Sequence, residues 1–268
     1  MILASRCFLV TAHALAVVLA TAAPVAAQER EFLFSLTTTP VEKHQASVSL
    51  DVGLGERDFT SGVENGVEQR LGLQARLSRR LTLVMAASLA MSERTTTLGA
   101  GHAELLASLR PIARTGFSVA VGGGVLREFD GTSTVRARLV SGHTFGRSRV
   151  LGNLLIEKPL ATGRDRLDLI SSVGWLTQVT RSVHLGIEGV AEDLEGFWQA
   201  DEAEGGARLL VGPTMHIGAM ERRWRMTVGG GPVFVGSASD RASGALRQLQ
   251  SGSSRRGYTA RVSWSYLF

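Results

Sequence analysis

The sequence predicts an antiparallel up-and-down β-barrel of about twelve strands that spans a membrane, and three observations support this fold class. Polar and apolar residues alternate along almost the whole chain after an apolar leader. Short and long connections between the alternating segments follow each other regularly. The chain ends in a segment with aromatic residues at alternate positions. A period of two indicates strands, because successive side chains of a strand point to opposite faces.

The leader predicts a cleaved secretory signal. An apolar run begins at Cys7, after Arg6, and small residues at Val25 and Ala27 precede the polar Gln28. This layout is typical of a signal peptide that is cut after Ala27. The alternative is a permanent anchor, but the run is short for a spanning helix. Because the chain's one cysteine lies in the leader, we expect no disulfide in the mature protein.

Two segments show the alternation most clearly. In residues 67–77, VEQRLGLQARL, Val67, Leu71 and Leu73 share one face, and charged or small residues occupy the other. In residues 81–91, LTLVMAASLAM, the larger side chains again fall on one face. Comparable alternation returns along the chain to its C-terminus, and almost nothing has the period of a helix.

The connections distinguish a membrane barrel from a soluble β-sandwich, which also alternates. The short connections are expected at residues 78–80, 111–116, 145–148, 180–182 and 219–223. The longer ones are expected at residues 55–65, 92–101, 128–134, 157–166, 192–205 and 237–257. Transmembrane barrels have this pattern because one rim carries tight periplasmic turns and the other carries extended external loops.

The domain organisation follows from this pattern. Residues 1–27 are the expected signal peptide, residues 28–43 a periplasmic lead-in, and residues 44–268 the barrel. Residues 31–39, EFLFSLTTT, also alternate in part, and with one further split elsewhere they would bring the strand count to fourteen. An even number of strands places both ends of the barrel on the short-turn rim.

The last strand, RVSWSYLF, is built to be held in place. It must pair with the first strand so that neither leaves an open edge in the membrane. Aromatic residues near the short-turn rim share the apolar face of their strands, which predicts a girdle at the membrane interface. The predicted girdle consists of Phe117, Phe145, Trp175, Trp224, Trp264, Tyr266 and Phe268.

The terminal strand resembles that of bacterial outer-membrane β-barrels, which typically ends in Phe with aromatic or apolar residues at alternate positions. The resemblance implies an outer-membrane location, contacts with its lipids and lipopolysaccharide, and recognition of the last strand by the barrel-assembly machinery. Strand–turn–strand units such as LSRRL are also similar to those of outer-membrane transporters associated with aromatic-compound degradation. No functional motif of that narrower group can be carried over to this chain.

Charged residues on the opposite parity are expected to face the lumen, where they avoid the cost of facing hydrocarbon. The predicted pore-lining residues are Arg70, Arg76, Glu104, Arg110, Arg136, Arg138, Asp168, Glu188, Arg208, Arg225 and Arg261. Small residues on the same parity, such as Ala86 and Ser88, leave room for water in a barrel of this intermediate size. Two interpretations stay open: a structural network across the lumen, and a narrow path for small polar or anionic solutes.

Other function classes receive less support. Ser141 and His143 suggest a lipid hydrolase, but no third partner is evident and the pair lies toward the periplasmic rim, so we do not expect an enzyme. His102, His184 and His216 fall on separate strands without metal-ligand spacing, and no cofactor is expected. Without the leader, 28 basic and 24 acidic side chains remain, too small an excess to indicate nucleic acid. A surface-interaction barrel without transport is the main alternative.

Two long external connections carry opposite charge. Residues 192–204, EDLEGFWQADEAE, hold six carboxylates and no base, whereas residues 237–256 hold four arginines and one aspartate. They are either solvated loops or the two halves of a lid across the pore.

Overall fold

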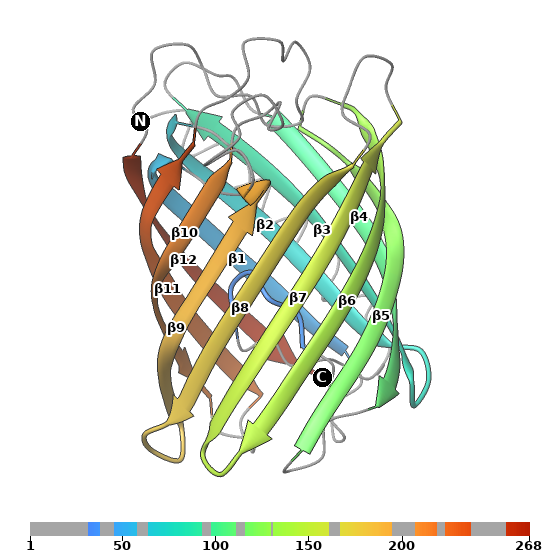
Figure 1. Cartoon of the computed structure of the whole chain (residues 1–268), viewed down its shortest axis with the longest axis vertical. Coiled ribbons are helices and arrows are strands. Elements are labelled where there is room, and N and C mark those ends of the chain that lie inside the picture. The colour runs from blue at the N-terminus through green and yellow to red at the C-terminus, as the bar shows by residue number, and fades with distance from the viewer. Residues whose placement is uncertain are drawn as a thin grey trace.

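The computed structural model describes residues 32–37, 46–57, 64–92, 98–110, 116–129, 131–160, 167–194, 207–218, 223–236 and 256–268. These residues form a closed barrel of twelve strands, as predicted (Figure 1). The strands are β1 (Ala46–Arg57), β2 (Glu64–Arg76), β3 (Leu81–Ser92), β4 (Leu98–Arg110), β5 (Gly116–Arg127), β6 (Ser133–Phe145), β7 (Ser148–Pro159), β8 (Asp168–Gln178), β9 (Val183–Glu192), β10 (Arg208–Ile217), β11 (Trp224–Val235) and β12 (Arg256–Leu267). No helix among the described residues is long and apolar enough to cross a membrane.

Each strand is antiparallel to the next, and β1 pairs with β12 to close the barrel. The register of this seam runs from Ser47 opposite Leu267 to Gly55 opposite Thr259. The N–H of Phe268 also donates to the carbonyl of Ala46 at 2.9 Å. Phe268 therefore belongs to the closing seam, where pairing removes the open edges of β1 and β12.

Outward residues are apolar and exposed, as a wall in contact with lipid requires. Val125 and Val173 are 58% and 59% exposed, while their inward neighbours Leu126 and Ser172 are buried. Because paired residues share a face, the register carries this separation from strand to strand. The outer wall is thus an apolar band, and most charged side chains of the strands point into the lumen.

Three tight turns at the short-turn rim have local causes. Gly146 adopts a φ of 58° in the two-residue turn between β6 and β7, a conformation that favours glycine. In the turns after β2 and β8, Ser78 Oγ and Thr180 Oγ1 accept the N–H of Leu81 and Val183 respectively, each at 3.1 Å. Such hydroxyl bonds satisfy backbone donors that a tight turn leaves without a ladder partner.

Candidate functional site

The predicted pore-lining residues point inward, with one exception. Glu104, Asp168, Glu188, Arg208, Arg225 and Arg261 are buried in the lumen. Arg70, Arg76, Arg136 and Arg138 are half-buried on the same face. The exception is Arg110, which the structure places on the outer face.

A β-bulge explains the different position of Arg110. Ser108 pairs with Ala120, but Arg110 pairs with Val119, so the register shifts by one residue between them. Val119 shares the outward parity with Phe117 and is not a lumenal residue. A shift of one residue moves a side chain to the other face of a sheet, and Arg110 is accordingly exposed at the short-turn rim.

Sequence reasoning missed several lumenal charges. Asp51 is buried on β1, and its flanking outward residues, Leu50 and Val52, carried the signal that could have identified it. Glu157 and Glu192 were expected in connections, yet they are buried inside β7 and β9. Glu128 directly follows β5 and is also buried. Strands that extend further than predicted toward the external rim therefore add carboxylates to the lumen.

These carboxylates balance the arginines of the lumen. The inward carboxylates of the described strands and their ends are Asp51, Glu68, Glu104, Glu128, Glu157, Asp168, Glu188 and Glu192, and the inward arginines are Arg70, Arg76, Arg136, Arg138, Arg149, Arg208, Arg225 and Arg261. The predicted pore-lining set, in which arginines outnumber carboxylates, is therefore incomplete. The described part of the lumen carries carboxylates and arginines in equal number.

One pair bridges the closing seam. Gly53 on β1 lies between Glu68 on β2 and Arg261 on β12 in a single row of the sheet. Arg261 Nη2 reaches across this glycine to Glu68 Oε2 at 2.5 Å. A Cβ atom at Gly53 would lie 3.0 Å from that guanidinium, so the absent side chain provides the room. In the same seam, Ser263 Oγ donates to Asp51.

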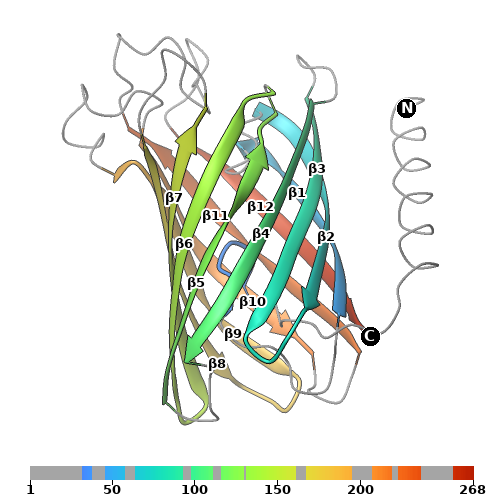
Figure 2. The same cartoon turned by 90° about the vertical axis from the view of Figure 1, so that its right-hand side faces the viewer.

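Residues 32–37 lie inside the barrel, where Figures 1 and 2 show them as a blue segment surrounded by strands. This corrects the expectation that residues 28–43 are a periplasmic lead-in, at least for these six positions, and they are not an additional strand. The N–H groups of Leu33, Phe34 and Ser35 all donate to the carboxylate of Glu188, at 3.0, 3.0 and 2.9 Å. Ser35 Oγ adds a bond to Glu188 Oε1 at 3.0 Å. We call residues 32–37 the lumenal segment.

Side chains of the lumenal segment pack against walls on both sides of the barrel. Phe32 is fully buried with Leu151 and Leu176. Leu36 packs with Val84 on β3 and Leu106 on β4. The segment therefore crosses the lumen from β7 and β8 to β3 and β4.

A cavity of about 130 Å³ lies on the external side of the lumenal segment. Leu33, Phe34 and Leu36 of the segment contribute to its lining, and Glu128 and Phe129 contribute from the connection at the external rim. The other lining residues that carry or position charge lie on the strands: Arg70, His102, Arg136, Arg138 and Asn153. Among the described residues of the lining, Glu128 is the one carboxylate.

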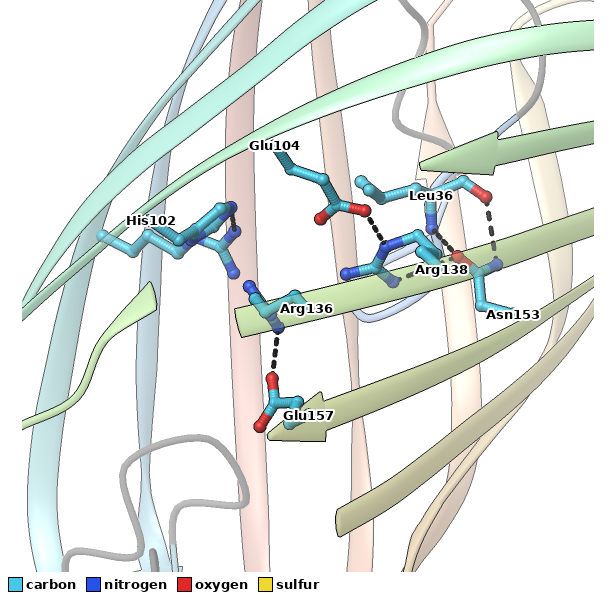
Figure 3. Close-up of polar contacts among 8 residues, drawn as sticks. Leu36, His102, Glu104, Arg136, Arg138, Asn153 and Glu157 are labelled. Atoms are coloured by element: carbon cyan, nitrogen blue, oxygen red, sulfur yellow. Dashed lines mark hydrogen bonds and ion pairs between the residues drawn. The ribbon is translucent and has the colours of Figure 1, made fainter. Parts of the chain in front are cut away.

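The arginines of the cavity are held from behind by carboxylates. Arg136 and Arg138 lie on the inward face of β6, and Figure 3 shows them in the space between His102 and Leu36. Arg138 Nε donates to Glu104 Oε1 at 2.6 Å, and Arg136 Nη2 contacts Glu157 Oε1 at 2.8 Å.

The Asn153 amide and the His102 imidazole make further contacts with Arg138 and Arg70 respectively. Arg138 Nη1 donates to Asn153 Oδ1 at 3.3 Å, and Asn153 clamps Leu36 by accepting its N–H at 3.1 Å and donating to its carbonyl at 3.0 Å. Arg70 Nη2 lies 3.4 Å from His102 Nε2. The guanidinium groups of the cavity are thus held in place, and Asn153 links Arg138 to the lumenal segment by hydrogen bonds.

The predicted girdle residues lie near the short-turn rim on the outer face. Phe117, Phe145, Trp175, Trp224 and Trp264 are all more than 40% exposed. Tyr266 stacks edge-on with Trp224 at 4.7 Å and with Phe268 at 4.9 Å between ring centroids. The rings of Trp224, Tyr266 and Phe268 thus form a continuous aromatic surface beside the closing seam.

The histidines of the described strands are distributed over both faces. His143 is outward, and its ring stacks on Phe145 at 5.8 Å rather than on a lumenal group. His184 and His216 are inward, with ring centroids 5.8 Å apart, and His216 Nδ1 lies 3.0 Å from Thr227 Oγ1.

No protein-family model and no curated protein matches the chain. Among solved structures, the fold is similar to that of the KdgM porin, with a TM-score of 0.50 and 12% identity over 83% of this chain and 99% of that one. It is also similar to the NanC porin, with a TM-score of 0.54 and 7% identity over 82% of this chain and 98% of that one.

These likenesses show the fold. The protein is a closed transmembrane barrel of the kind found in the bacterial outer membrane. The narrower resemblance to transporters associated with aromatic-compound degradation stays a prediction.

Proposed function

We propose that the protein is a narrow outer-membrane channel for small polar or anionic solutes. The observation that carries this proposal is the cavity on the external side of the lumenal segment, with Arg70, Arg136 and Arg138 in its lining. A solute that enters from the external rim meets these guanidinium groups before it meets the lumenal segment. Guanidinium groups recognise carboxylate and phosphate oxygens through fixed pairs of N–H donors.

The size of the cavity restricts the solute. A dry cavity of about 150 Å³ in another protein holds a single benzene molecule. A cavity of about 130 Å³ therefore suits a small solute rather than an oligomer. Larger molecules would require the side chains that line it to move.

The expected preference for anions is modest. Glu104 and Glu157 neutralise part of the charge on Arg138 and Arg136. Lumenal charges still act strongly on ions, because the low-dielectric wall screens them less than bulk solvent screens an open surface. The pairing keeps the guanidinium groups in place while it reduces the net positive charge.

Planar-bilayer recordings test this proposal. The double variant Arg136→Glu and Arg138→Glu should move the reversal potential in a KCl gradient toward cations. The control is the double variant Arg147→Glu and Arg181→Glu, which makes the same charge change at two exposed turn residues. A shift as large in the control as in the lumenal variant would contradict a solute path past Arg136 and Arg138.

A surface-interaction barrel without transport is the second candidate function. The balance of lumenal carboxylates and arginines and the segment that crosses the lumen both favour it. Absence of current from the wild-type protein, and from variants designed to release the lumenal segment, would support this candidate instead.

The aromatic surface suggests how the barrel is seated. We infer that the outward rings of Trp224, Trp264 and Tyr266 lie at the periplasmic membrane interface, where aromatic side chains are favoured. Their position beside the closing seam also supports recognition of the last strand by the barrel-assembly machinery. Contacts of the outer wall with lipids and lipopolysaccharide follow from the same orientation.

A further inference from the structure

We propose that the lumenal segment, residues 32–37, is a removable plug and that Glu188 is the latch that holds it. This inference rests on the proposed channel function for its consequence, the control of solute passage, but the latch itself can be tested without any current.

The hydrogen bonds of Glu188 identify it as the latch. Its carboxylate is buried, and it accepts the N–H groups of Leu33, Phe34 and Ser35 together with the Ser35 hydroxyl. Among the described residues these bonds are the complete polar environment of Glu188, and no arginine is paired with it. Other lumenal carboxylates, such as Glu104 and Glu157, are paired with arginines of the barrel wall. Glu188 is therefore built to bind the backbone of the segment.

Three successive N–H groups directed at one carboxylate form a strong and specific contact. Hydrogen bonds to an ionised acceptor are roughly twice as strong as neutral ones. The contact is also reversible, because Glu188 projects from β9 into the lumen and water can solvate it when the segment leaves. A segment that was paired into a β-ladder would not be released in this way.

The other side chains of the lumenal segment also fit specific positions of the barrel wall. Phe32 occupies the space above Gly174, where a Cβ atom would lie 2.2 Å from its ring. The guanidinium of Arg261 lies 5.4 Å from the centre of the Phe34 ring. Ser35 Oγ is 2.8 Å from Ser172 Oγ. The barrel wall thus contains a matching position for each of these side chains.

The plug is placed where it controls passage. Leu33, Phe34 and Leu36 form part of the floor of the external cavity. His216 and Arg225 lie on the inward face closer to the short-turn rim. A solute in the cavity must therefore pass the plug to reach the periplasmic half of the lumen. While it is bound in the cavity, the solute contacts the plug directly.

Replacement of the latch should open the barrel. Glu188→Gln keeps the side-chain size, but it removes the charge and one of the two acceptor oxygens. Loss of bonds to an ionised acceptor should raise the open probability in planar bilayers at least about tenfold. The matched control is Glu56→Gln, the same chemical change on an exposed residue of β1. Equal currents in the two variants would overturn the latch.

A disulfide can lock the plug, because Ser35 and Ser172 are already in hydroxyl contact. The variant Ser35→Cys and Ser172→Cys should lose both thiols on oxidation with diamide, as counted by maleimide–polyethylene glycol after unfolding. The chain's one cysteine, Cys7, lies in the predicted signal peptide and can be replaced by Ser to remove competition. Failure of this pair to form the disulfide would overturn the position of the plug.

The lock and the latch combined separate the two proposals. In Glu188→Gln with both cysteines, oxidation should lower the current to the wild-type level. Reduction with dithiothreitol should then bring back the higher current of Glu188→Gln. An oxidised protein that still conducts like Glu188→Gln would show that the plug is not the gate. If no variant conducts, the channel proposal fails, and the latch is then tested by the rate of disulfide formation alone. Slower disulfide formation in Glu188→Gln than in Glu56→Gln supports it, and equal rates refute it.

Discussion

The pair between Glu68 and Arg261 should hold the closing seam of the barrel. Strands lie about 4.8 Å apart, so two residues separated by one strand are roughly twice that distance apart at their Cα atoms. Arg261 spans this gap over Gly53 to reach Glu68, and the two residues are 2% and 1% exposed. Because both charges are withdrawn from water, neither can be replaced by solvent when its partner is removed.

The magnitude follows from this burial. Glu68→Ala or Arg261→Ala alone breaks this buried ion pair, and each should lower the free energy of unfolding by about 3–5 kcal/mol. The apolar double variant Glu68→Leu and Arg261→Met removes both charges and should be much closer to the wild type. The exposed control Glu56→Ala should change the free energy of unfolding by no more than about 0.5 kcal/mol.

Unfolding by guanidinium chloride in lipid vesicles measures these effects, with the fluorescence of the outward Trp175, Trp224 and Trp264 as the signal. Loss of the faster migration that unheated barrels show on a denaturing gel provides a second readout. If each single variant costs less than about 1 kcal/mol and the double variant equals their sum, the pair does not stabilise the seam.

Two further predictions concern the plug and the terminal strand. Gly174→Val places side-chain atoms within the space of the fully buried Phe32 ring and should expel that ring. Loss of about 1.5–3 kcal/mol of burial free energy should raise the current about tenfold or more. An unchanged current would count against the fit of Phe32 over Gly174. Deletion of Phe268 removes its bond to Ala46 and its contact with Tyr266. In cells this deletion should reduce the folded fraction in the outer membrane far more than it lowers the unfolding temperature of the refolded barrel, and normal insertion would remove the assembly role of the last strand.

The fold could be predicted because its main determinants are local. Alternation sets the face of each side chain, and turns such as those at Ser78 and Thr180 depend on residues a few positions apart. Arg110 shows the limit of this reasoning. One extra residue in β4 moves it to the outer face, and no feature of residues 98–110 marks the position of the bulge.

The plug could not be predicted from the sequence. Phe32, Phe34 and Leu36 alternate with other residues as they would in a strand, so the local pattern gives no indication of a lumenal position. Its hydrogen bonds to Glu188 and Asn153 join residues more than 100 positions apart. Glu188 itself has the same alternation as any inward carboxylate of a barrel. Only the arrangement of the strands around the segment distinguishes a latch from a member of the lumenal charge network.

The opposite charges of the external connections give a last prediction, a lid in series with the plug. Residues 195–206 and 237–255 lie outside the described residues, but Glu192 is not part of this loop pair: it is buried in β9 beside Arg208. The sequence of residues 195–206 contains four carboxylates, and that of residues 237–255 contains three arginines and one aspartate, since Arg256 begins β12. Exposed pairs between the two connections would contribute only about 0–1 kcal/mol each. Such a lid would open readily and loosen at high salt.

Two barriers in series make the order of the experiment decisive, because opening one has little effect while the other stays closed. Deletion of residues 242–252 should leave the current of the wild-type protein almost unchanged, since the plug still blocks the lumen. The same deletion in Glu188→Gln should raise the current further, most clearly at low salt, where charge pairs are least screened. Reversal of Arg247 and Arg255 to Glu should act in the same direction. If the deletion raises the current of the wild-type protein as much as that of Glu188→Gln, the loops rather than the plug limit passage. If it raises neither, the loops do not form a lid.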